Sequence, residues 1–474
     1  MKINLDPILR LIPHIEKPKG SLSFREKLRN TGIILLIYFI MFSTPAIGAS
    51  INSSPALQII NIIFAARIGT LVTIGIGPIV LASIILQLLS GAGIINIDLN
   101  NPEEKGRFQS IQKLMAIIIA FVEAYIYVFT GYVPVINASL AFLVFLQLAI
   151  GAIIIIYLDE AMTKYGITSG INLFIASGVS YAIIAGTIEI VLPNVMQSFT
   201  TGGAAAISYA LLNSLPIIFT IIIMLISIYI MNINVEIPIV FTQLRGVGGK
   251  FPIPLLYVSV LPVILALSLI ISLDVWFRPL ASIPAARFFA YYAPVPNGNT
   301  SVLTLEGGLL YLISPPPVEP YSIGYNSYIQ FFLTSSSKLY LFGNNYINVP
   351  EWLHAIIFTV VLVLLCIVFG KFWVEMTGQN PKNIAEQLKE IGWQIPGFRR
   401  DPRIIESLLE RYIPIITILG SIIVGLLAAF ATLVGAIGSG MGILLDVAII
   451  NALYMQFEQE KELETLPFLN KLTK

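Results

Sequence analysis

An uncharged apolar run between Ile68 and Ile95, broken by glycine and proline near both ends, constrains this chain more than any other segment. The run reads IGTLVTIGIGPIVLASIILQLLSGAGII and is long enough to cross a hydrocarbon core about 30 Å thick. Just before it, SSPALQIINIIFAAR predicts a separate short helix, because Ser54 can act as its N-cap and Pro55 suits its first turn. We therefore expect a half helix, a break and then a full span. Because broken helices are tolerated in lipid only where the freed backbone faces protein or water, this segment is a candidate pathway.

The composition places the chain in a membrane. It is 57% hydrophobic and only 11% charged, whereas soluble domains carry about 25% charged residues. The one cysteine, Cys366, lies in an apolar run, which excludes an internal disulfide and a cysteine-based metal cluster. The first apolar span begins near Thr31 behind a long polar segment, so we expect no cleavable signal peptide.

Apolar segments of roughly 20 residues predict an all-α polytopic membrane protein with ten transmembrane helices, in two inverted five-helix halves. The predicted spans are 31–49, 74–95, 112–131, 139–158, 168–191, 212–232, 255–274, 351–373, 411–434 and 439–457. With the N-terminus in the cytoplasm, 23 lysines and arginines lie inside and 4 outside. This asymmetry predicts a multi-pass cell-membrane protein with both termini cytoplasmic.

The spans define the expected organisation of the chain. In order, these parts are a cytoplasmic segment 1–30, a first half 31–191 with the short helix at 55–66, a second half 212–457, and a cytoplasmic tail 458–474. The second half includes cytoplasmic loops 233–254 and 374–410 and an outer loop 275–350. The outer loop is rich in Pro, Gly, Asn, Ser and Tyr, and its alternating aromatic stretches predict an ordered region with some β-structure.

Motifs for catalysis or cofactor binding are weak. His14 and His354 fall on opposite sides of the membrane, so we expect no metal site. The GVGGK sequence at 246–250 lacks the spacing of a phosphate-binding loop, and Pro252 and Pro254 follow in place of a helix, which favours a hairpin. The sequence gives no positive indication of an enzyme or of a bound cofactor.

Apart from the terminal positions Asp274 and Glu351, the acidic residues within predicted spans are Glu123, Glu189 and Asp446. A charge in lipid costs roughly 3 kcal/mol or more, so each should face a cavity or a partner. For Glu123 and Asp446 the choice lies between ion binding or a gate contact and a hydrogen bond to Ser, Thr or Asn on a neighbouring helix.

Long stretches of the chain resemble the archaeal and eukaryotic branch of the SecY family, the central subunit of the protein-conducting channel. The stretches are GTLVTIGIGPIVLASIILQLL (69–89), FVEA (121–124), YLDEAMTKYGITSGINLFIASGVS (157–180), RGVGGKFPIPLLYVSVLPVIL (245–265), FWVEMTGQNPK (372–382) and GFRRDPR (397–403). They occur in order from about residue 20 to 460. The resemblance implies an hourglass pore that a short plug closes and that can open sideways to lipid.

The same resemblance implies which residues form the pore. A constriction ring would consist of aliphatic residues from four spans: Ile76, Val80, Ile171, Ile175, Ile264 and Leu445. A narrow aliphatic neck excludes water and ions, while its side chains can adapt to a passing chain. The plug would run from Pro55 to Ala66, followed by Arg67, and its sealing residues would be Ile59, Ile60, Ile62, Ile63 and Phe64.

A lateral gate would separate spans two and three from spans seven and eight. Gln87 and Glu123 match polar gate positions. The chain departs from the family at Leu81, where a polar residue is frequent, and at Ser272, where the family has asparagine.

Basic residues on two cytoplasmic loops would contact the ribosome. Arg245 and Arg399 match the key positions, with Lys250 and Arg400 nearby. Arginine can pair bidentately with phosphates of ribosomal RNA. The implied partners are a SecE-like (gamma) subunit, a small beta subunit, and the ribosome with a nascent polypeptide and its signal sequence.

Two other function classes remain open on the sequence. A secondary transporter of a small solute would also explain a broken helix and inverted halves, but it should place polar ligands at mid-membrane. A structural membrane scaffold leaves the glycine breaks unexplained.

Overall fold

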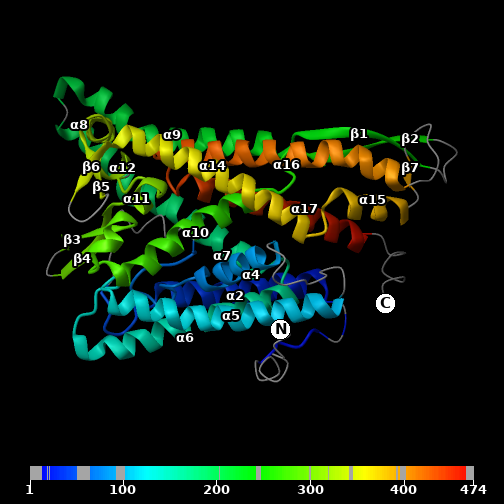
Figure 1. Cartoon of the computed structure of the whole chain (residues 1–474), viewed down its shortest axis with the longest axis horizontal. Coiled ribbons are helices and arrows are strands. Elements are labelled where there is room, and N and C mark those ends of the chain that lie inside the picture. The colour runs from blue at the N-terminus through cyan, green and yellow to red at the C-terminus, as the bar shows by residue number, and fades with distance from the viewer. Residues whose placement is uncertain are drawn as a thin grey trace.

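A computed structural model describes most of the chain. The described residues are 13–18, 20, 22–50, 64–91, 102–201, 203–241, 247–297, 300–318, 320–340, 345–390, 393–394 and 402–465. The protein is a bundle of long apolar helices with a small β-sheet at each end (Figure 1).

Long helices make up both halves of the bundle. The first half contains α2 (Phe24–Ser43), α4 (Gly77–Gly91), α5 (Pro102–Phe129), α6 (Ala141–Tyr165) and α7 (Gly170–Ala185). The second half contains α9 (Ala206–Met231), α10 (Leu261–Phe277), α14 (Glu351–Met376), α16 (Pro402–Leu433) and α17 (Gly440–Thr465).

Local sequence explains where several helices begin. Ser23 caps α2 in a capping box: the Glu26 carboxylate accepts from the Ser23 N–H at 2.9 Å, and the Ser23 hydroxyl accepts from the Glu26 N–H. At α7, the Ser169 side chain accepts from Asn172 N–H, and Asp159 of α6 accepts from Ile171 N–H at 2.9 Å. Two oxygens thus satisfy the first turn of α7 and tie it to α6.

Eight helices of the described chain are long and apolar enough to cross a membrane, and Gly77–Ser90 is a shorter apolar helix. The protein is therefore a polytopic helical membrane protein; the count of ten spans and the inverted repeat remain predictions. Several helices extend beyond the predicted spans. The clearest case is the fifth, where a π-helical turn (Gly186–Val191) joins α7 to α8 (Leu192–Thr201).

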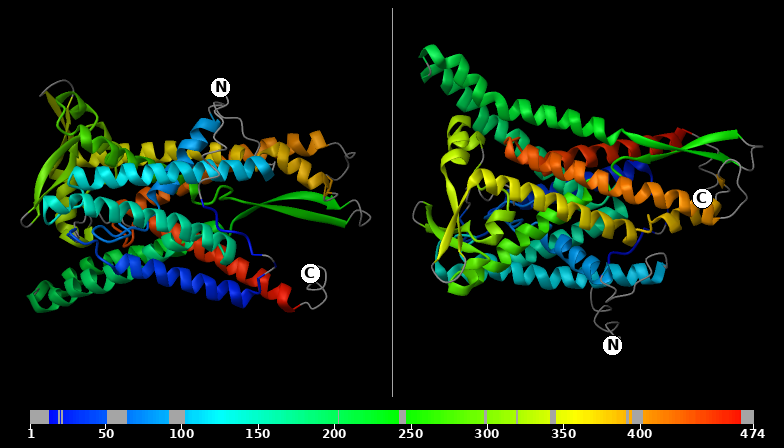
Figure 2. Two further views of the ribbon diagram at one scale, coloured as in Figure 1. Left: turned by 90° about the horizontal axis from the view of Figure 1, so that it is seen from below. Right: turned by 45° about the horizontal axis from the view of Figure 1, so that its top comes forward.

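The two sheets lie at opposite ends of the bundle (Figure 2). One sheet has the order β2-β1-β7, in which β1 (Asn234–Phe241) and β2 (Val247–Pro254) form an antiparallel hairpin and β7 (Trp393–Gln394) pairs with β1. The residues after Gly246 form a strand, which confirms the hairpin interpretation. A phosphate-binding loop would be followed by a helix instead.

The other sheet belongs to the predicted outer loop, and its presence confirms the expected β-structure there. Its order is β3-β4-β5-β6, with β4 and β5 parallel and the other pairs antiparallel. The strands are β3 (Tyr291–Asn297), β4 (Thr300–Gly307), β5 (Ser336–Tyr340) and β6 (Tyr346–Pro350). Three short helices accompany them: α11 (Leu309–Ile313), α12 (Pro320–Ile323) and α13 (Tyr325–Thr334).

The halves meet along a shared apolar core. In Figure 1, α2, α5 and α6 form a lower layer and α9, α14 and α16 an upper one, with α10 and α17 between them. Helix α4 packs against α10 and α14, and α7 packs against α17. One continuous hydrophobic cluster crosses this boundary, so the centre of the molecule is closed by side chains from both halves.

Candidate functional site

The predicted break before the second span is present. Residues between Ala66 and Gly77 form turns and an isolated bridge, and α4 begins only at Gly77. Gly69 and Gly75 have φ values of +90° and +60°, which disfavour any residue with a Cβ. A Cβ at Gly75 would also lie 2.0 Å from the carbonyl oxygen of Phe64. The glycines therefore allow one segment of chain to lie directly against another.

This close approach brings the end of the predicted plug to the predicted ring. The N–H of Ile76 donates to the Phe64 carbonyl at 2.8 Å, and Phe64 itself is buried. The hydroxyl of Tyr38, on α2, donates to the Ala65 carbonyl at 2.8 Å. Arg67 lies with its guanidinium carbon 5.6 Å from the Phe42 ring.

The described part of the plug differs from the prediction in one respect. Phe64 and Ala65 form a turn where the last helical residues were expected, because Ala65 has a left-handed φ of 47° that a helix cannot continue. The other predicted plug residues lie outside the described residues: Pro55, Ile59, Ile60, Ile62 and Ile63.

Five of the six predicted ring residues belong to the central hydrophobic cluster, and Ile171 packs against it. Ile76 directly precedes α4, and the others lie on α4, α7, α10 and α17. Five of them are 7% exposed or less, and Ile171 is half-buried. The structure therefore places residues that the sequence spreads over almost 370 positions in or against one large apolar core built by both halves, and their arrangement as a ring stays a prediction.

Asp446 follows ring residue Leu445 and has a partner. The Ser180 hydroxyl of α7 lies 3.3 Å from each Asp446 carboxylate oxygen. This contact matches the hydrogen-bond alternative that the sequence left open, and it joins α7 to α17 beside the ring.

The predicted gate helices pack together, since α4 contacts α5, α10 and α14 and α5 contacts α10. Gln87, Glu123 and Ser272 are all buried. Each has a buried side-chain oxygen without a hydrogen-bond partner among the described residues: Gln87 Oε1, Glu123 Oε2 and Ser272 Oγ. Buried polar atoms without partners cost free energy, so this boundary is closed but imperfectly satisfied.

The Glu123 carboxyl lies close to the first residue of α4. A Cβ placed on Gly77 would be 3.3 Å from Glu123 Oε2 and 3.5 Å from the Phe64 ring. The hydrogen bond to a neighbouring Ser, Thr or Asn that the sequence considered is not formed by this oxygen within the described part of the chain. Glu123 and Phe64 thus both lie against the first residue of α4.

The two loops predicted to carry the ribosome contacts lie side by side. Strand β7, from loop 374–410, pairs with β1 from loop 233–254 at Val240↔Gln394 and Phe241↔Trp393. Lys250 lies in β2 opposite Pro238. Arg245, Arg399 and Arg400 lie outside the described residues.

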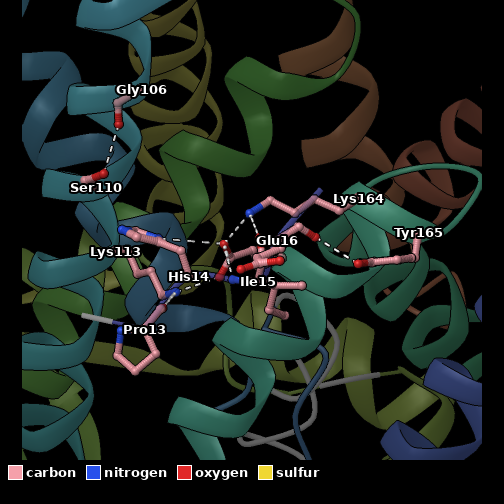
Figure 3. Close-up of polar contacts among 10 residues, drawn as sticks. Pro13, His14, Ile15, Glu16, Gly106, Ser110, Lys113, Lys164 and Tyr165 are labelled. Carbon is pink, nitrogen blue, oxygen red and sulfur yellow. Dashed lines mark hydrogen bonds and ion pairs between the residues drawn. The ribbon is translucent and has the colours of Figure 1, made fainter. Parts of the chain in front are cut away.

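An ion-pair cluster that the sequence analysis missed clamps the N-terminal segment (Figure 3). Glu160 of α6 pairs with Lys113 of α5 and with Lys164, each at 2.6 Å. The two lysines also donate to the backbone carbonyls of Pro13 and Ile15. The spacing of Glu160 and Lys164 was visible as an i,i+4 pair, but no local pattern points to Lys113.

This clamp, made of Lys113, Glu160 and Lys164, borders a cavity with a partly polar and partly apolar lining. Its volume is about 380 Å³, and it lies between α5, α6 and residue His14. Ile79 and Ala116 form part of its wall, so it reaches from the clamp toward the start of α4.

The fold and site define a class of protein: a multi-pass helical membrane protein whose two halves close on an apolar centre behind a broken helix. The SecY family profile matches residues 70–454. The SecY protein translocase subunit of Methanocaldococcus jannaschii is 40% identical over 470 residues, 99% of each chain, and that of Archaeoglobus fulgidus is 34% identical over 502 residues. This chain belongs to the SecY family.

Solved structures agree with that assignment. A protein-conducting channel superposes with a TM-score of 0.79 at 39% identity, covering 98% of both chains. The Sec61 chain of a canine ribosome–channel complex gives 0.76 at 39% identity, again covering 98% of both chains. A SecY structure whose plug domain is described as stabilising the closed channel gives 0.76 at 40% identity.

Proposed function

We propose that this chain is a protein-conducting channel that translocates unfolded secretory polypeptides and releases membrane-protein helices sideways into lipid. One observation carries the proposal: the six aliphatic residues matched to the ring lie in or against one closed apolar core that both halves build, and the Ile76 N–H just before α4 donates to the Phe64 carbonyl. Such a neck excludes water at rest and can widen if the halves separate. A solute transporter would need polar ligands at this centre, and the ring supplies none.

Crosslinking tests this assignment. Photoreactive residues at Ile76, Ile171 and Leu445 should each form adducts with a stalled, ribosome-bound nascent chain. Ile221 of α9 is exposed on the outside of the bundle and serves as the control position, where no adduct is expected. A docked nascent chain that crosslinks at none of the three ring positions would contradict the channel.

The plug and the lateral gate are parts of the same proposal. Phe64 and its neighbours would seal the funnel next to Ile76, and α4 with α5 would separate from α10 with α14. Direct packing of these helices and the unsatisfied Gln87, Glu123 and Ser272 support a boundary that can open. A disulfide engineered between α4 and α10 should block export, and normal export with the bond formed would exclude lateral opening.

Partners follow from the family and from the loop arrangement. We propose a ribosome-binding surface on the β1–β2 hairpin and loop 374–410, with Arg245, Lys250, Arg399 and Arg400 as the phosphate contacts. The β1–β7 pairing supports it by joining the two loops. A SecE-like subunit and a small beta subunit complete the proposed complex, and copurification with tagged chain tests them.

The proposed orientation puts both termini in the cytoplasm. The start of α2 and the last third of α17 lie together, since the Phe24 and Phe457 rings are 4.9 Å apart, which supports a common side for the two termini. Figure 1 shows both at the same end of the bundle as the β1–β2 hairpin. Labelling of single cysteines at Arg25 and Glu458 by a membrane-impermeant reagent should occur only in inside-out vesicles.

A further inference from the structure

A buried arginine lies where α10 ends and the outer sheet begins. Arg278 is 4% exposed. Its Nη2 pairs with Asp274 Oδ2 at 3.2 Å, and its Nη1 donates to the Leu303 carbonyl of β4 at 2.7 Å. Tyr292 of β3 donates to the Asp274 carboxylate at 2.9 Å and lies with its ring 5.3 Å from the guanidinium carbon. The charge is therefore neutralised, and the side chain is fixed in place, by groups of the second half.

The first half contributes an aromatic ring to this arginine. The guanidinium carbon lies 4.3 Å from the centre of the Tyr132 ring, which follows α5 and is fully buried. Tyr132 stacks on Tyr127 of α5 with ring centres 4.6 Å apart. Neither tyrosine hydroxyl has a hydrogen-bond partner in the described part of the chain, so it is the ring face of Tyr132 that meets Arg278. A cation over a desolvated ring is a favourable contact.

Tyr127 connects this contact to the gate. It lies one helical turn after Glu123 on α5, so both occupy the same face of that helix. A buried line of side chains therefore runs from the start of α4, through Glu123, Tyr127 and Tyr132, to Arg278 at the outer end of α10.

We propose that Tyr132 and Arg278 form a latch that holds the outer ends of α5 and α10 together, and that the β3–β6 sheet positions the guanidinium for it. The inference rests on the proposed lateral gate, and it assigns a role to the outer sheet. The latch is built to be reversible. When the halves part, Arg278 keeps Asp274 and Leu303, so opening exposes no unneutralised charge and breaks only the ring contact.

The test measures gate opening in the complete complex reconstituted in lipid. Spin labels replace Tyr125 of α5 and Ile356 of α14, two exposed positions on opposite sides of the gate, in a Cys366→Ala background. Their distance distribution is recorded at rest and with bound signal peptide. The variant is Tyr132→Leu, which removes the ring, and the matched control is Tyr132→Phe, which keeps the ring and removes only the unpartnered hydroxyl.

We expect Tyr132→Leu to raise the resting ratio of open to closed channel about tenfold, and Tyr132→Phe to leave it unchanged. Tyr292→Phe removes one of the two side chains that bind the Asp274 carboxylate and should give a smaller rise. Should Tyr132→Leu fail to accumulate in the membrane, Tyr132→Met takes its place. An unchanged resting distribution in a ring-free variant, with normal opening by signal peptide, overturns the latch alone. Failure of the signal peptide to open the unmodified channel overturns the proposed gate instead.

Discussion

Two sets of polar side chains in the molecule are built in opposite ways. In the clamp, Glu160 accepts from Lys113, from Lys164 and from the Ile15 N–H, and both lysines also bind backbone carbonyls. Among the predicted gate residues, Gln87, Glu123 and Ser272 each bury an oxygen that no described group satisfies. Both sets include a residue of α5. Lys113 belongs to the satisfied ion-pair network, whereas Glu123 has a carboxylate oxygen without a described partner.

The difference shows which boundary is built to move. A satisfied network stabilises one arrangement, and separating its members leaves buried charges without partners. An unsatisfied boundary already carries the desolvation cost of its polar atoms, and opening returns those atoms to water or to a passing polypeptide. In the proposed channel the clamp would stabilise the first half, while the unsatisfied gate residues would lower the free energy needed to part the halves.

The largest effect should come from placing an unsatisfied polar group in the ring. Ile76→Asn or Leu445→Asn should weaken the closed state by about 3 kcal/mol, because each loses apolar burial and buries an amide without partners. Single-channel conductance of reconstituted complex should then show ion leak at rest, and export of poorly targeted substrates should rise. Ile76→Leu keeps the apolar volume and is the control; unchanged leak and substrate selection in both asparagine variants would exclude these residues from the ring.

The second-largest effect should come from a substitution in the clamp. Glu160→Gln keeps the side-chain shape but removes the charge between two lysines, which should cost about 2 kcal/mol of stability. We expect a lower thermal midpoint and faster proteolysis within residues 13–18. Glu375→Gln removes an exposed carboxylate on α14 and should change neither quantity. A clamp variant that keeps the wild-type cleavage rate would show that the N-terminal segment is held by other contacts.

Substitution of a gate residue should stabilise the closed state, whereas the two preceding changes destabilise the protein. Glu123→Leu removes a carboxyl with an unsatisfied oxygen and adds apolar surface, so the closed state should gain about 1 kcal/mol. We expect a higher thermal midpoint together with slower export of substrates with weak signal sequences. Thr417 also has a buried oxygen without a described partner but lies on α16, which is not one of the gate helices, and Thr417→Val should leave export unchanged. A lower thermal midpoint for Glu123→Leu would mean that this carboxyl has a hydrogen-bond partner when the protein is in the membrane.

The smallest effect should come from Ser272→Ala. Its hydroxyl has no described partner, so its removal should stabilise the closed state by less than about 1 kcal/mol. Combining it with Glu123→Leu tests whether the two groups act as one cluster: a sum that departs from additivity in thermal midpoint indicates coupling across the gate.

Sequence reasoning recovered the features that local chemistry dictates. Gly69 and Gly75 revealed the break before α4, and the glycines and prolines around Lys250 revealed the hairpin. The ring residues came from a family resemblance, because a lone isoleucine in an apolar helix carries no sign of its role. The contact of Tyr132 with Arg278 could not be predicted, since 146 positions separate the two residues and neither position has a local pattern.

Local sequence patterns also could not predict where the helix of the fifth span ends. The prediction stopped at 191, just before Pro193, which normally ends a helix. The structure places a π-helical turn at Gly186–Val191, and the chain continues as α8. A wide turn leaves room for proline without breaking the helix, and nothing in the sequence marks where such a turn will form.

That continuous helix has a consequence for the surrounding lipid. At about 1.5 Å per residue, the helical stretch from Gly170 to Thr201 is roughly 48 Å long, well beyond a hydrocarbon layer of about 30 Å. No charged residue occurs between Glu189 and Glu236, so neither its far end nor the start of α9 carries a charge to hold it in water. The helix projects beyond the hydrocarbon layer unless it leans or the bilayer beside it thickens. The free energy of this helix in the membrane therefore depends on the thickness of the bilayer around it.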